Sequence, residues 1–243
     1  MAGPFPGGRW NASVSSSPAE TGDQVLDAFA AETDQLAVVM LDVAPADWSR
    51  ASPCPPWTVA ELLGHVAVVI GWLPGMLAAP APPRAEVSAA GYYRADDRFS
   101  PRTNAVRLDL ATRRAAAAPD GHALARAFHA DQREIVGRCR REPADRVVVT
   151  RHGDAMLLTD FLVTRVVEVG IHGLDLAAGL GRPAWLTSAA AAVLTDLFLG
   201  DGGRAAARRL GWDDPTLLRK VTGREPLTDQ EAAGLGARRL TLG

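Results

Sequence analysis

The sequence contains few of the residue types that would assign it to several common protein classes. It has two cysteines in 243 residues, Cys54 and Cys139, too few for a disulfide framework or a thiolate-rich metal site. Lysine occurs once, at Lys220, so arginine supplies almost all of the positive charge. The formal net charge of −2 predicts no basic surface for nucleic acid. We therefore expect a cytoplasmic protein with no nucleic-acid partner.

Several sequence motifs are also absent. There is no Gly-rich phosphate loop, no Gly-x-Ser-x-Gly elbow and no internal repeat. The N-terminus lacks the basic start and apolar stretch of a secretory signal, and we predict a disordered leader over residues 1–16. We predict no membrane-spanning helix and no membrane partner, because we identify no sufficiently long apolar run free of charge.

Helix signals dominate the remaining chain. Capping boxes and apolar residues at helical spacing predict a mainly all-α fold, a four-helix bundle over residues 17–183. The β-branched run and His-Gly-Asp turn in 145–160 predict a short β-hairpin just before the last bundle helix. We expect that helix over 159–178, with Gly179 and Gly181 as stop signals, and a small, mostly helical C-terminal extension over 184–243.

The last bundle helix carries a line of ionisable residues in an apolar sequence. Arg165, Glu168, His172 and Asp175 follow one another at spacings of three, four and three, so they share one helix face. Burying these groups is costly unless they are paired or bind a metal. One interpretation is a salt-bridged polar seam, in which Arg165 pairs with Glu168 and His172 with Asp175.

A second segment supports a different interpretation. In the apolar stretch 57–72, Glu61 belongs to a capping box, but His65 has no local explanation. Facing inward in one bundle, His65, Glu168 and His172 would form a two-histidine, one-carboxylate set with an open coordination position, as in catalytic zinc sites. Asp175 would suit an acceptor that orients the His172 ring.

Two segments carry a family resemblance. "PCPPWTVAELLGHV" and, about a hundred residues later, "TRVVEVGIHGLDLAAGLG" resemble the mycothiol-dependent maleylpyruvate isomerase family of the DinB-like superfamily. The resemblance covers about residues 23–181. It implies a DinB-like four-helix bundle with a divalent metal, usually zinc, on His65, Glu168 and His172. It does not extend to the tail at 187–243, which leaves substrate and reaction open.

The predicted chemistry follows from an open metal position. A bound cation favours the thiolate form of a thiol, and the family implies mycothiol, a thiol of GC-rich actinobacteria, as co-substrate. We therefore predict a thiol-dependent isomerase or S-transferase that acts on a small electrophilic molecule. A metal-dependent hydrolase and a non-catalytic metal-binding or regulatory bundle remain alternatives. The metal's identity stays open between zinc, nickel and other divalent ions.

The remaining candidates have weaker signals. Arg165 is expected to hold Glu168, and Trp72 to form a wall of the pocket above the metal. Cys54 could be a fourth ligand or a nucleophile, although a small buried structural residue is the simpler interpretation. The Tyr92–Tyr93 pair could belong to a lid. We expect a monomer or a homodimer.

Other ionisable candidates are assigned no role in the chemistry. These are Cys139, His122, His129 and His152.

Overall fold

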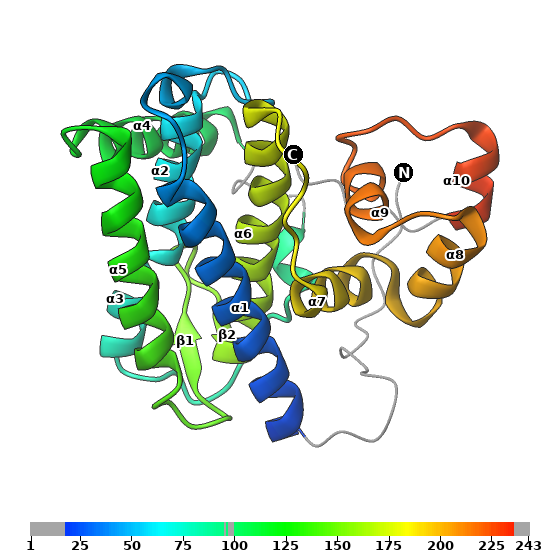
Figure 1. Cartoon of the computed structure of the whole chain (residues 1–243). Coiled ribbons are helices and arrows are strands. Elements are labelled where there is room, and N and C mark those ends of the chain that lie inside the picture. Colours follow the sequence, from blue (N-terminus) through cyan, green and yellow to red (C-terminus); the bar gives the residue numbers. More distant parts are fainter. Residues whose placement is uncertain (1–17, 95, 97–99, 236–243) are drawn as a thin grey trace.

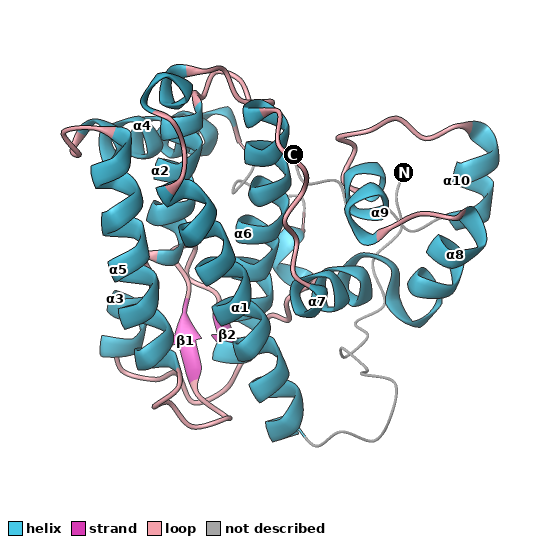
Figure 2. Ribbon diagram, in the orientation of Figure 1, coloured by secondary structure: helices cyan, strands magenta, loops and turns pink. Residues whose placement is uncertain are grey.

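The computed structural model describes residues 18–94, 96 and 100–235. The predicted leader, residues 1–16, lies outside the described residues, as does Ser17, the first residue of the bundle predicted over 17–183. Within the described residues the protein is mainly helical, with one two-stranded antiparallel hairpin (Figures 1 and 2). The predicted fold class is therefore confirmed.

Four long helices pack side by side and enclose the main apolar core (Figure 1). They are α1 (Pro18–Leu41), α2 (Val59–Ile70), α5 (Gly121–Cys139) and α6 (Leu158–Leu180). Helix α6 is buried along most of its length, because apolar side chains occupy nearly every position of its circumference. A polar residue on the inner face of α6 is therefore held among packed side chains and can meet only nearby residues of α6 itself or of the segments packed against it.

Local sequence signals fix the ends of the two helices that matter most for the site. Thr58 caps α2: its hydroxyl accepts a hydrogen bond from the Glu61 backbone N–H, and the Glu61 side chain accepts one from the Thr58 N–H. Helix α6 ends at Gly181, whose φ of 65° is the left-handed conformation that glycine adopts readily. Gly179, expected as a stop signal, lies inside α6 instead, because the helix continues to Leu180. There an added Cβ atom would make ordinary van der Waals contacts with Ser52 and Pro53.

Helix α4 (Pro101–Ala116) lies against α2 at a very short separation. A Cβ atom on Gly64 would lie 2.6 Å from the carbonyl oxygen of Ala111, closer than such contacts allow. Only glycine therefore permits this approach of the two backbones. The contact seats the α2 turn that carries His65 firmly against α4.

The segment Val59–Ala78 is long and apolar enough to cross a membrane, judged by length and composition. This differs from the expectation that no apolar run would reach that length. In the structure 61% of its most apolar window is buried inside the protein. The chain also turns at Gly71 and Trp72 before the short helix α3 (Leu73–Ala78). These residues thus form two helices of the protein, α2 and α3, which are joined by a turn.

The hairpin precedes α6 as predicted. Strands β1 (Val147–Val149) and β2 (Ala155–Leu157) pair antiparallel, with Val148 opposite Met156. The proline-rich loop that follows α3 is tied to this hairpin, since the backbone N–H groups of Glu86 and Val87 both donate to the Ala155 carbonyl. Short 3₁₀ turns occur at Pro45–Ser49, Gly91–Tyr93 and Gly200–Gly202.

Beyond α6 the chain forms smaller helices on the side of the bundle opposite α5 (Figure 1). They are α7 (Ser188–Leu199), α8 (Gly203–Leu210), α9 (Asp214–Val221) and α10 (Asp229–Leu235). These helices agree with the small, mostly helical extension that the sequence predicts. Helix α7 packs on α1 and α6, and α9 packs on α6 and α7. The division at residue 183 stays a prediction.

Candidate metal centre

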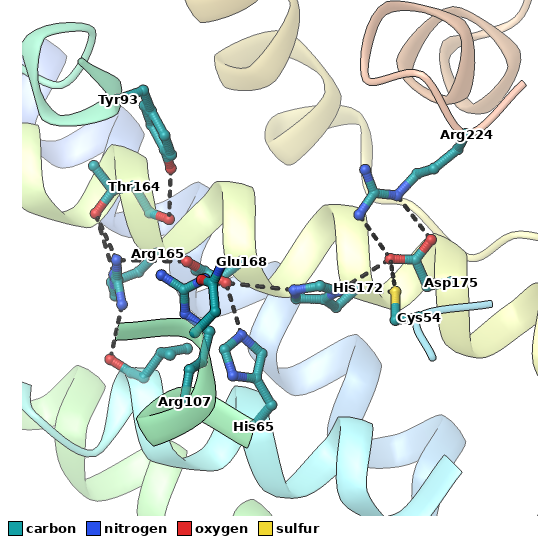
Figure 3. Close-up of polar contacts among 12 residues, drawn as sticks. Cys54, His65, Tyr93, Arg107, Thr164, Arg165, Glu168, His172, Asp175 and Arg224 are labelled. Carbon is teal, nitrogen blue, oxygen red and sulfur yellow. Dashed lines mark hydrogen bonds and ion pairs between the residues drawn. The ribbon is translucent and has the colours of Figure 1, made fainter. Parts of the chain in front are cut away.

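Three ionisable side chains from two helices converge inside the bundle (Figure 3). His65 of α2 places Nε2 3.1 Å from Oε2 of Glu168 on α6. The same carboxylate oxygen lies 3.5 Å from Nε2 of His172, one turn further along α6. One ligand atom from each residue falls within 4.8 Å of the others, so the group can hold a metal ion. The structure thus brings together the three residues that the sequence analysis singled out.

His65 is held by burial and by an aromatic contact. It is only 3% exposed, and its ring stacks on Trp57 with centroids 4.7 Å apart and planes at 23°. Burial lowers the pKa of His65 to about 4, although the hydrogen bond with Glu168 acts in the opposite direction. His65 is therefore neutral at physiological pH, which is the protonation state that a metal ligand requires.

Glu168 is the shared partner of both histidines. Burial favours its neutral form, but the hydrogen bonds with His172 and His65 outweigh burial and hold the pKa of Glu168 well below its usual range. Arg165 adds positive charge, with Nη2 3.9 Å from Glu168 Oε1. Its stronger contacts are elsewhere, since it donates to the Val69 carbonyl and to the Thr164 hydroxyl. Arg165 is thus a fully buried cation beside Glu168 rather than a tight ion-pair partner.

The two ring nitrogens of His172 face different partners. Nε2 points toward Glu168, and Nδ1 lies 3.0 Å from Oδ2 of Asp175. Burial alone would lower the pKa of His172, but its hydrogen bonds with Asp175, Cys54 and Glu168 raise it well above its usual range. A histidine whose Nδ1 is bound to a carboxylate presents Nε2 in a fixed direction, as metal-binding histidines commonly do. The contact between Asp175 and His172 is the one that helical spacing predicts, and its role in orienting a metal ligand stays a prediction.

Asp175 has two further partners that the sequence analysis did not connect to it. Arg224 donates from Nε to Oδ1 at 2.8 Å and from Nη2 to Oδ2 at 2.9 Å, and the Cys54 thiol donates to Oδ2 at 3.2 Å. Burial acts to raise the pKa of Asp175, but its bonds with His172 and Arg224 hold the pKa well below its usual range. No sequence signal joins Arg224 to Asp175, because the two residues lie 49 positions apart in different helical units.

The separations suit a small divalent cation. Ligand atoms about 2.1 Å from a tetrahedral zinc ion lie about 3.4 Å from one another. The two ligand distances to Glu168, 3.1 Å and 3.5 Å, match that spacing. Two imidazoles and a carboxylate also form the donor set of catalytic zinc sites, which leave one position open, and a cation on Nε2 of His172 would take the place of a proton there. The residues present therefore fit the group that the sequence pattern implies.

A second set of potential ligands, Cys54, His172 and Asp175, lies on the other side of the His172 ring. Its carboxylate is already bound on both oxygens by the Arg224 guanidinium. This set is thus complete without a cation. Cys54 lies on the Nδ1 side of His172, 3.9 Å away, and so cannot share a metal with Nε2.

Cationic and aromatic side chains surround the carboxylate end of the site. Trp72 has the Arg165 guanidinium 5.6 Å and the Arg151 guanidinium 4.6 Å from its ring centroid. Trp72 thus contacts Arg165, the buried cation beside Glu168, and its role as a wall of the pocket above the metal stays a prediction. Tyr93 donates weakly to the Thr164 carbonyl at 3.5 Å, and burial followed by the charge of Glu168 raises its pKa.

Other ionisable candidates lie outside the cluster. Cys139 is buried in α5, and burial raises the pKa of its thiol to about 12, which makes it unreactive. The His122 ring contacts Trp48 edge-on, and the His152 ring contacts Tyr92. None of these residues belongs to a metal-binding group within the part of the chain that the structure describes.

Comparison with known proteins connects this geometry to a family. Residues 12–177 match the model of the mycothiol maleylpyruvate isomerase N-terminal domain. Among solved structures, a mycothiol-dependent maleylpyruvate isomerase is similar with a TM-score of 0.53 and 19% identity, over 73% of this chain and 69% of that one. A histidine-to-alanine variant of such an isomerase gives a TM-score of 0.49 and 18% identity over the same shares. No curated protein matches the sequence.

Proposed function

The chain belongs to the family of the mycothiol maleylpyruvate isomerase N-terminal domain, and on this basis we propose that it is a metal-dependent, thiol-dependent isomerase or S-transferase. The substrate would be a small electrophilic molecule, and the co-substrate a low-molecular-weight thiol of the mycothiol type. The observation that carries the proposal is the convergence of His65, Glu168 and His172 from α2 and α6. We further propose that the protein acts in the cytoplasm as a monomer or homodimer.

The proposed roles of the residues follow from their positions. Nε2 of His65, Nε2 of His172 and a carboxylate oxygen of Glu168 would hold the cation. When bound, a divalent cation would stabilise the thiolate form of a thiol, the nucleophile for addition to an electrophilic carbon. Asp175, with Oδ2 3.0 Å from Nδ1 of His172, would accept a hydrogen bond from Nδ1 and so direct Nε2 toward the cation. Trp57 covers one face of His65 and excludes water from it.

Charge balance around the site supports an anionic ligand. Arg165 offsets the charge of Glu168, and Arg224 offsets that of Asp175. A bound divalent ion would therefore leave the site with a net positive charge in a largely buried environment. Such a site favours an anion over a neutral ligand at the open position, and a thiolate is such an anion.

The first test concerns the metal itself. We expect about one divalent ion per chain, lost in His65→Ala and in Glu168→Ala, because each substitution removes one of three ligands. Elemental analysis of purified protein measures this, with His129→Ala as the control, since His129 lies outside the cluster. A wild-type protein that takes up neither zinc nor nickel would favour the salt-bridged seam over the metal site.

The second test concerns the thiol and needs no substrate. Cobalt-loaded protein titrated with mycothiol should develop a thiolate-to-cobalt charge-transfer band, and an alcohol analogue of the thiol should not produce it. Metal binding without this band would point instead to a hydrolase or to a non-catalytic metal protein. Turnover without added thiol would distinguish the hydrolase from the other two.

A further inference from the structure

We propose that Arg224 is a positioning residue of the metal centre, which makes the C-terminal extension part of the site. The inference rests on the proposed metal binding. Arg224 lies beyond residues 12–177, the part of the chain that matches the family. It reaches the site through a chain of contacts from Arg224 to Asp175 and from Asp175 to His172 (Figure 3).

The Arg224 side chain is held in place by the end of α9. Gly223 has a φ of 76°, the left-handed conformation that reverses the chain after the helix. The Arg224 backbone N–H then donates to the Arg219 carbonyl at 2.8 Å, which closes the turn. Three buried apolar side chains, Leu217, Leu218 and Val221, fix α9. The backbone from which the Arg224 guanidinium extends is therefore held in place by the packing of α9.

The contact between Arg224 and Asp175 is of a strong type. Both carboxylate oxygens accept from one guanidinium, at 2.8 Å and 2.9 Å, which fixes the plane of the carboxylate as well as its position. The Asp175 side chain is 4% exposed, so little water is available to replace the guanidinium. Without Arg224, Asp175 would lose the partner of Oδ1 and keep only His172 and Cys54, both on Oδ2, so the plane of this buried carboxylate would no longer be fixed.

Rotation of Asp175 would move His172. The Nδ1 hydrogen bond to Asp175 is the contact that aims His172 Nε2 at Glu168. Groups that orient a metal-binding histidine in this way typically affect metal affinity by about 10–100-fold. Coupling between two sites is reciprocal, so metal binding should also stabilise the docking of α9 on α6.

Calorimetric titration with Zn²⁺ tests the proposal on the full chain. We expect Arg224→Ala to weaken zinc affinity by about 10–100-fold. Arg224→Lys should give an intermediate loss, because lysine restores the charge but not the two parallel hydrogen bonds. Arg204→Ala is the matched control: it removes another arginine–aspartate pair of the extension, with Asp196, that is remote from the described metal cluster.

Two further readouts separate positioning from loss of structure. The visible spectrum of the Co²⁺-loaded protein should change in Arg224→Ala and Arg224→Lys but not in Arg204→Ala, because the spectrum reports ligand geometry. Amide hydrogen exchange in α9 should slow on zinc binding in wild type and much less in Arg224→Ala. If Arg224→Ala does not fold, the affinity and spectrum of Arg224→Lys decide.

The outcomes distinguish the two proposals. Wild-type affinity and an unchanged cobalt spectrum in the folded Arg224 variants would overturn the positioning role and leave the proposed function intact. A wild-type protein that binds no zinc, cobalt or nickel would overturn both. Equal losses in Arg224→Ala and Arg204→Ala would show that the extension acts only through general stability, which also overturns the positioning role.

Discussion

Trp57 contacts the rings of both histidines in the candidate metal centre. It stacks on His65 and meets His172 edge-on, with ring centroids 6.4 Å apart. A turn closed by the Trp57 N–H and the Cys54 carbonyl holds it there. The indole N–H is buried and has no hydrogen-bond partner within the described residues. Trp57 therefore contacts His65 through the face of its ring and not through a hydrogen bond. The short turn thus places a single side chain, Trp57, in contact with the rings of both histidines.

Substitution of Trp57 should affect metal binding through packing alone. We expect Trp57→Leu to weaken zinc affinity by about 3- to 10-fold, because an aromatic contact of this kind contributes about 0.5–1.5 kcal/mol. Trp57→Phe keeps an aromatic face and should stay within about twofold of wild type. Calorimetric titration measures both. A loss in the phenylalanine variant as large as that in the leucine variant would contradict the role of the aromatic face.

At this scale the sequence allowed part of the site to be predicted. His65, Glu168 and His172 stood out because each interrupts an apolar helix without a local role, and helical spacing placed Asp175 beside His172. Cys54, Trp57 and Arg224 lie in loops or turns, where no periodicity defines a direction. Their contacts depend on how separate elements pack, which a single sequence does not encode in any local pattern.

At the scale of elements, Gly64 sets the distance between α2 and α4. We expect Gly64→Ala to lower the free energy of unfolding by about 1–3 kcal/mol, because the added methyl group forces the two helices apart. Gly75 is the control: it lies in α3 with open space where an added methyl group would lie, and Gly75→Ala should stabilise by about 0.5–1 kcal/mol. Urea unfolding of the two variants measures both effects. Equal changes in the free energy of unfolding for Gly64→Ala and Gly75→Ala would contradict the close approach of α2 and α4.

Glu32 links α1 to the start of α7. Its Oε2 accepts hydrogen bonds from the Thr187 backbone N–H and hydroxyl, whereas Oε1 has no partner in the described part of the chain. Burial raises the pKa of Glu32 above its ordinary value of 4.5, despite the hydrogen bonds from Thr187. The folded protein therefore binds the Glu32 proton more tightly than the unfolded chain does.

The sign of the pH effect follows from linkage. Between pH 4.5 and the raised pKa, the contribution of Glu32 to stability falls as pH rises, because the folded state must give up a proton that it binds tightly. Glu32→Gln removes that ionisation and should flatten the dependence, with a gain of about 1 kcal/mol over wild type at neutral pH. Urea unfolding of both proteins across this range measures the difference. A difference that does not vary with pH would contradict the raised pKa.

Helices that begin at a capping side chain were more predictable from the sequence than helix α8, which has none. Capping residues such as Thr58, Asp120 and Thr187 act within four residues of chain, and the structure shows each of them capping a helix. Helix α8 has no such cap, since its N-cap is Gly202 and no side chain bonds to its first turn. It forms because Ala206 and Ala207 are buried against the neighbouring helices. That stabilisation comes from tertiary packing, which the local sequence does not reveal.

For the whole molecule, the metal should act as a cross-link between distant parts of the chain. A ligand that binds only the folded state stabilises it by about 2.7 kcal/mol at 100 times its Kd. We therefore expect zinc to raise the Tm of wild type, and to leave the Tm of His65→Ala nearly unchanged. Differential scanning calorimetry with and without zinc measures this. A similar rise in both proteins would place the bound zinc elsewhere.

The order in which the site's residues are synthesised has a consequence for the nascent chain. His65 leaves the ribosome well before Glu168, since 103 residues separate them. At about 5–20 residues per second this is a delay of roughly 5–20 s. During that time α2 exposes a histidine and an apolar surface with no α6 to cover them. Arg224 emerges later still, 49 residues after Asp175. Metal capture would thus be a late event of biosynthesis, and ribosome-bound fragments that end before α6 should carry no metal.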